Sequence, residues 1–134
     1  MLDLLPATAE DVAALSHAIN LLSETGLPDW LVQGKPPTGE TVKTVVMDGR
    51  RVATFWCWFS RPNGCLVINA AASLVHEDVG DPLFAGMRRY ADQVGARRIE
   101  FTTARRGLAL ASQRYGFRPD GLRCSLNLEE VSRA

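Results

Sequence analysis

The sequence has no excess of either charge, and it has no long apolar stretch. Fifteen lysine and arginine residues balance fifteen aspartate and glutamate residues over 134 positions. Nucleic acids and anionic membranes attract proteins through an excess or a strong cluster of positive charge. No apolar run reaches the roughly 20 residues that a membrane-spanning helix needs. We therefore expect a protein that binds neither nucleic acid nor membrane.

Cysteine is also scarce. The three cysteines, Cys57, Cys65 and Cys124, have no spacing typical of a zinc site, and an odd number makes a poor disulfide framework. Each lies in an apolar stretch, where a free cysteine behaves as a small buried hydrophobe. The N-terminus lacks the basic and apolar regions of a secretory signal. These observations favour a reduced, cytoplasmic setting, and no bound metal is expected.

The apolar content is sufficient for one core. Hydrophobic residues make up 46% of the chain and charged residues 22%, which fits a single domain over residues 1–134. Thr8 is a suitable helix N-cap, and Asp48-Gly49 and Asn63-Gly64 are typical hairpin turns. Asp81 is expected to cap a later helix that has Pro82 in its first position.

Apolar periodicity between these turns and caps predicts the order of the elements. We expect a strand at 2–5, a helix at 8–22, a short helical turn at 29–31, strands at 42–47, 51–59 and 65–74, a helix at 81–94, a strand at 97–103, a helix at 107–115, a turn at 119–121 and a strand at 122–128. This order predicts an α/β fold, with a mixed sheet and helices on both faces.

Three segments resemble the GNAT (GCN5-related N-acetyltransferase) superfamily. They are residues 4–15 (LLPATAEDVAAL), residues 94–101 (VGARRIEF) and residues 113–120 (QRYGFRPD), and the Asp48-Gly49 hairpin with the long strand after it fits the same order. The resemblance spans nearly the whole chain, and the order and spacing carry it together. It implies a mostly antiparallel, twisted sheet of about six strands, acetyl-CoA as the acyl donor and an amine as the acceptor.

The resemblance also implies a binding loop for the donor. In the family, a loop between the fourth strand and the next helix presents backbone N–H groups and glycines to the CoA pyrophosphate. Gly80 matches the last glycine of the pattern Gln/Arg-x-x-Gly-x-Gly/Ala. The implied donor contacts in this chain are then Leu74, Val75, Val79 and Gly80, with Arg105 near the nucleotide phosphates.

Two positions of that loop depart from the family pattern. Val75 stands where the pattern has Gln or Arg, and Asp78 stands where it has Gly. Glu77 and Asp81 add two more carboxylates close by, and like charges disfavour a bound pyrophosphate. We therefore interpret the donor loop as degenerate.

The catalytic residues are less defined. The family's tyrosine, which protonates the departing thiolate, corresponds by position to Ser112, and a serine hydroxyl is a poor acid for that step. Tyr115 lies close by, although its spacing indicates a core position. His76 begins a His/carboxylate segment that could be a base or a metal site, but residues of one loop rarely converge on a metal, so a solvated loop is the favoured interpretation.

Two hypotheses about function follow. One is a GNAT-like N-acetyltransferase that uses acetyl-CoA on an unknown amine. The other is an inactive GNAT-fold module that binds a protein partner or belongs to a larger assembly. Degenerate GNAT-like chains of this size occur among bacteriophage proteins, so the second hypothesis includes a virion component. A homo-oligomer is compatible with either.

Overall fold

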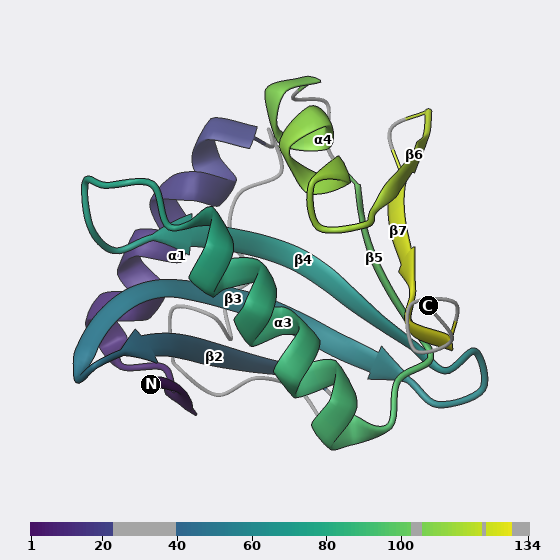
Figure 1. Cartoon of the computed structure of the whole chain (residues 1–134). Coiled ribbons are helices and arrows are strands. Elements are labelled where there is room, and N and C mark those ends of the chain that lie inside the picture. Colours follow the sequence, from purple (N-terminus) through teal and green to yellow (C-terminus); the bar gives the residue numbers. More distant parts are fainter. Residues whose placement is uncertain (23–39, 103–105, 122, 130–134) are drawn as a thin grey trace.

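The computed structural model describes residues 1–22, 40–102, 106–121 and 123–129 (Figure 1). Arg105 lies outside these residues, as does the expected helical turn at 29–31. The elements are, in chain order, β1 (Leu2–Pro6), α1 (Ala9–Leu22), β2 (Glu40–Met47), β3 (Arg50–Ser60), β4 (Cys65–Ser73), α3 (Gly80–Val94), β5 (Arg98–Thr102), α4 (Arg106–Gln113), β6 (Arg118–Asp120) and β7 (Arg123–Asn127).

All the described strands belong to one seven-stranded sheet, in the order β1-β2-β3-β4-β5-β7-β6. The first four strands are antiparallel neighbours, and β2, β3 and β4 form a meander through the two hairpin turns predicted from the sequence. Strand β5 pairs in parallel with β4, and β7 returns antiparallel beside β5. The sheet is therefore mixed and mostly antiparallel, as expected. The additional strand is β6, a three-residue edge strand that overlaps the turn predicted at 119–121.

Helices α1 and α3 cover opposite faces of this sheet (Figure 1). Apolar residues alternate along β3, so Phe55 and Cys57 face α3, whereas Trp56 belongs to a smaller cluster with Leu15 of α1. The edge-to-face contact of Phe55 with Tyr90 of α3, at 6.3 Å between ring centroids, belongs to the main core. Both faces of β3 are therefore apolar, and each packs against a helix, as the prediction of helices on both faces of the sheet required.

Helix α3 lies close to the sheet because it has a glycine at the contact. A Cβ atom added at Gly86 would stand 2.5 Å from Cγ2 of Val45. Valine has a restricted χ1 and cannot easily move aside. The close approach explains why a residue that weakens an isolated helix is found in the middle of this one.

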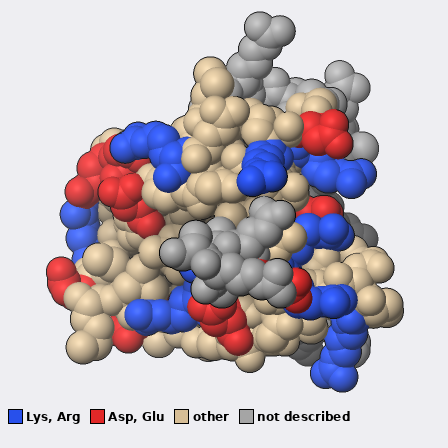
Figure 2. Space-filling model, turned by 45° about the vertical axis from the view of Figure 1, so that its right-hand side comes forward, with Lys and Arg blue, Asp and Glu red and all other residues tan. Residues whose placement is uncertain are grey.

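Charged side chains are mixed over the surface. On the face that Figure 2 shows, lysine and arginine residues alternate with aspartate and glutamate residues, and neither sign dominates. The described helices include none that is long and apolar enough to cross a membrane.

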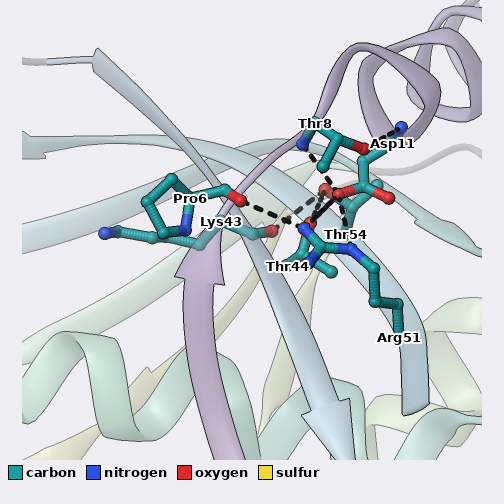
Figure 3. Close-up of polar contacts among 7 residues, drawn as sticks. All are labelled: Pro6, Thr8, Asp11, Lys43, Thr44, Arg51 and Thr54. Carbon is teal, nitrogen blue, oxygen red and sulfur yellow. Dashed lines mark hydrogen bonds and ion pairs between the residues drawn. The ribbon is translucent and has the colours of Figure 1, made fainter. Parts of the chain in front are cut away.

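A buried carboxylate joins the first helix to the meander (Figure 3). Asp11 is only 3% exposed, and its Oδ2 atom accepts hydrogen bonds from Thr44 Oγ1 at 2.6 Å and Arg51 Nη2 at 2.6 Å. The same oxygen accepts the N–H of Thr8 at 2.9 Å, while Thr8 Oγ1 accepts the N–H of Asp11 at 3.2 Å. This reciprocal pair is a capping box, with aspartate in the place of the usual glutamate. The capping role predicted for Thr8 is confirmed.

The environment of Asp11 favours its charged form. Burial alone would raise the pKa of the carboxyl, but the hydrogen bonds from Arg51, Thr44 and Thr8 outweigh it, and the pKa lies below its ordinary value. Arg51 Nη2 also donates to the carbonyl oxygen of Pro6 at 3.1 Å. One ion pair therefore connects β1, α1, β2 and β3.

Replacing Asp11 by asparagine should destabilise the protein by about 2 kcal/mol, because the change removes one partner from a buried, hydrogen-bonded ion pair. Urea unfolding at pH 7 measures this. Glu10→Gln is the matched control: it removes the same charge one residue earlier, from an exposed side chain, and should change the unfolding free energy by less than about 0.5 kcal/mol. An Asp11→Asn protein as stable as the control would contradict the assigned role of the ion pair.

The stabilisation by Asp11 should depend on pH in one direction. A carboxyl whose pKa is lowered by folding stabilises the protein fully above its unfolded pKa of about 3.9, and the contribution disappears as the pH falls through the lower folded pKa. The difference in unfolding free energy between the natural protein and Asp11→Asn should therefore be constant from pH 7 to about pH 5 and decrease in more acidic solution. A difference that increases on acidification would overturn this assignment.

Candidate functional site

Strands β4 and β5 are paired over only part of their length. Their parallel pairing runs from Cys65 and Arg98 to Ile68 and Phe101, and β4 then continues to Ser73 paired with β3 alone. The two strands diverge beyond this point (Figure 1). Among the described residues, no strand pairs with the β5 side of residues 69–73, so this stretch of β4 is a free edge inside the sheet.

A β-bulge coincides with the point of divergence. In the β3–β4 ladder, Trp56 pairs with Ala70 and Cys57 pairs with Ile68, which leaves Asn69 as the extra residue of β4. A bulge bends its strand and increases the local twist. The extra residue therefore turns β4 away from β5 where their pairing stops.

A cavity of about 430 Å³ occupies the space next to the free edge. Residues 68–73 of β4 form its base, residues 77–80 form its mouth at the start of α3, and Leu83, Phe84 and Met87 of α3 form one wall together with Phe101 and Thr102 of β5. Ala71 pairs with Phe55, and the two side chains share the face that α3 covers. Small side chains on β4 and apolar side chains on α3 thus leave a slot between strand and helix.

The mouth of this slot is the N-terminus of α3, but its cap differs from the expected one. The predicted cap, Asp81, is wrong: Val79 holds the N-cap position, and its side chain makes no capping hydrogen bond. Oδ1 of Asp78 accepts the N–H of Gly80 at 2.9 Å. An aspartate that bonds to the N–H two residues ahead is a common local motif, so the sequence did contain this signal. The carboxylate of Asp78 therefore lies at the positive end of the helix dipole.

The other backbone donors predicted in the loop are also engaged within the chain. The N–H of Leu74 donates to the carbonyl oxygen of Val52 at 2.9 Å, and the N–H of Val75 donates to Oγ of Ser73 at 3.3 Å. Glu77 pairs with Arg50 at 2.5 Å, with both side chains largely exposed. Of the predicted donor contacts, Val79 and Gly80 line the slot, whereas Leu74 and Val75 do not. The N–H groups of Leu74, Val75 and Gly80 already have partners within the chain.

Tyr115 connects the end of α4 to this mouth. Its ring stacks on Phe84 with centroids 4.4 Å apart, and its hydroxyl donates to Oδ1 of Asp81. The hydrogen bond to Asp81, together with burial, raises the pKa of Tyr115 above its ordinary value. The side chain is only partly buried, so the core position predicted for it describes the ring and not the hydroxyl. Sequence reasoning missed the Tyr115–Asp81 contact, which joins residues 34 positions apart.

The remaining candidates do not meet at the slot. Ser112 is fully buried, and its hydroxyl donates to the carbonyl oxygen of Ala109 at 2.7 Å, which does not suit a proton donor to a bound thiolate. His76 is exposed in the loop before α3. Among the described side chains, no group of three or more histidine, cysteine, aspartate or glutamate residues could hold a metal ion.

Several solved acetyltransferases have the same fold. The structure superposes on aminoglycoside acetyltransferase AAC(6')-Ib in complex with paromomycin and acetyl-CoA, with a TM-score of 0.73, 13% identity and coverage of 99% of this chain and 97% of that one. For RimJ of Mycobacterium smegmatis in complex with CoA-disulfide, the TM-score is 0.67 at 15% identity, over 97% of this chain and 83% of that one.

A third likeness is to the ribosomal-protein-S18-alanine N-acetyltransferase of Escherichia coli, with a TM-score of 0.65, 10% identity and coverage of 96% of this chain and 94% of that one. No protein-family model and no curated protein matches the sequence. At these identities the likeness concerns architecture: the chain has the fold of the GNAT N-acetyltransferases.

Proposed function

We propose that the protein transfers an acyl group from a pantetheine thioester, such as acetyl-CoA, to an amine. The observation that carries this proposal is the slot of about 430 Å³ between the free edge of β4 and helix α3. Neighbours with the same fold have been solved with acetyl-CoA or coenzyme A, which supports the choice of donor. For the acceptor, only the chemical class, an amine, is proposed.

The slot suits the pantetheine arm in two respects. The arm is a flexible chain with two amide groups, and an unpaired strand edge can hydrogen-bond to amides as another strand would. Residues 69–73 provide such an edge, and Leu83 and Met87 provide an apolar wall against the methylene groups of the arm. A bound arm would therefore fill the place that β5 leaves open.

The reaction requires two proton transfers. The amine nitrogen forms a bond to the thioester carbonyl carbon as the carbon–sulfur bond breaks; the nitrogen loses a proton and the departing thiolate takes one up. Of the three residues considered as candidates, Tyr115 has its hydroxyl beside Gly80, which lines the slot. Asp81 accepts a hydrogen bond from this hydroxyl and holds it in place beside Gly80. We therefore regard Tyr115 as the leading candidate for the proton donor.

A second function is favoured by the state of the loop. The N–H groups of Leu74, Val75 and Gly80 are already bonded within the chain, and the carboxylate of Asp78 lies where an anionic donor would bind. An inactive module that binds a protein partner, for example in a virion, would retain the fold with such a loop. Binding of a pantetheine thioester to the purified protein distinguishes the two functions, because the module has no need of it.

Replacing Ala71 by phenylalanine should weaken the binding of acetyl-pantetheine by about tenfold or more, because the ring would fill the slot where the arm lies. Titration calorimetry measures the affinity. The cavity gives room for the new side chain, so the melting temperature should change little. Ala85→Phe is the matched control, since Ala85 is an exposed residue of α3 outside the slot. Equal affinities for the two variants would contradict the proposed position of the arm.

A further inference from the structure

We propose that Asp78 determines which part of the acyl donor this protein recognises: its carboxylate occupies the anion position at the N-terminus of α3, so that the slot selects the uncharged acyl-pantetheine arm and gains little from the donor's diphosphate. This inference rests on the proposed function and makes it more specific. It concerns donor specificity and does not assign the acceptor.

The N-terminus of α3 has already used one of its N–H groups within the chain. A helix N-terminus binds an anion through N–H groups that have no partner within the helix. In α3 the N–H of Gly80 already donates to Oδ1 of Asp78 at 2.9 Å. The preceding loop offers no substitute at Leu74 or Val75, because their N–H groups donate to Val52 and Ser73. A diphosphate that uses the N–H of Gly80 must therefore first displace Asp78.

The start of α3 also carries negative charge. Glu77 and Asp78 line the mouth, and Asp81 follows in the first turn of α3; each of the three carboxylates has a different partner. Glu77 is paired with Arg50, and Asp81 accepts the hydroxyl of Tyr115, which is neutral. Among the ion pairs of the described residues, none includes Asp78 or Asp81. Within the described part of the chain, a diphosphate would thus approach two carboxylates that form no ion pair, and like charges at this range oppose binding.

The inside of the slot contrasts with its mouth. Away from the mouth, the lining residues of β4, α3 and β5 are small, apolar or uncharged, from Ala70 and Ala71 to Leu83 and Thr102. Such a lining does not repel an uncharged arm that contains amide groups. The slot therefore favours the pantetheine arm of the donor, whereas the mouth disfavours its diphosphate. A donor without a nucleotide loses no affinity at the mouth.

The experiment compares acetyl-CoA with acetyl-pantetheine, which carries no phosphate, on the natural protein and on Asp78→Asn. Asparagine keeps an oxygen that can accept the N–H of Gly80 but removes the charge. By calorimetry, we expect the natural protein to bind the two thioesters with similar affinity. We expect Asp78→Asn to bind acetyl-CoA about tenfold more tightly and acetyl-pantetheine unchanged.

Asp92→Asn is the control, because it removes the same charge from an exposed residue near the other end of α3, about 20 Å away and beyond the range of screened interactions. It should change neither affinity. Two results would overturn the inference alone: acetyl-CoA binding the natural protein far more tightly than acetyl-pantetheine, or Asp78→Asn leaving the acetyl-CoA affinity unchanged while acetyl-pantetheine binds. If neither thioester binds any folded variant, the proposed function fails as well.

Discussion

The constraint on which this structure depends is that β4 must pair with β3 along its whole length but with β5 along only half of it. The extra residue at Asn69 meets this requirement, since it shifts the β3–β4 register at the position where pairing with β5 ends. The slot, the exposed strand edge and the placement of α3 over the gap follow from it. Strand β5 itself ends at Thr102, one residue beyond this pairing, so the last residues of β4 have no partner on that side among the described strands.

On the opposite face of the sheet, polar contacts join the first helix to the strands. There, the buried ion pair of Asp11 and Arg51 fixes α1 and β1 against β2 and β3, so that the meander is held by polar contacts of defined geometry. Polar groups with complete hydrogen bonding specify one arrangement where apolar packing alone tolerates several. Strand β4, which borders the slot, pairs along its length with β3, one of the strands that this ion pair joins.

Much of this fold could be predicted from the sequence, because its signals are local. The hairpin turns, the Thr8 cap and the alternation along β3 depend on neighbouring residues alone. Strand β6 was not predicted, because Pro119-Asp120-Gly121 favours a turn and only the pairing with β7 makes it a strand. At the site, the position of Gly80 at the mouth was predictable, but Ser112 was placed by counting, which cannot show that its hydroxyl is buried. Which aspartate accepts an N–H group at the start of α3 depends on the path of the loop, and this path is set by tertiary contacts.

Tyr115 has a mechanical consequence for the parted strands. Helix α3 follows β4 and helix α4 follows β5, so the stacking of Tyr115 on Phe84 and its bond to Asp81 tie together the segments that continue the two diverging strands. The parallel pairing of the two strands ends at Ile68 and Phe101, and one aromatic side chain links the segments that follow them.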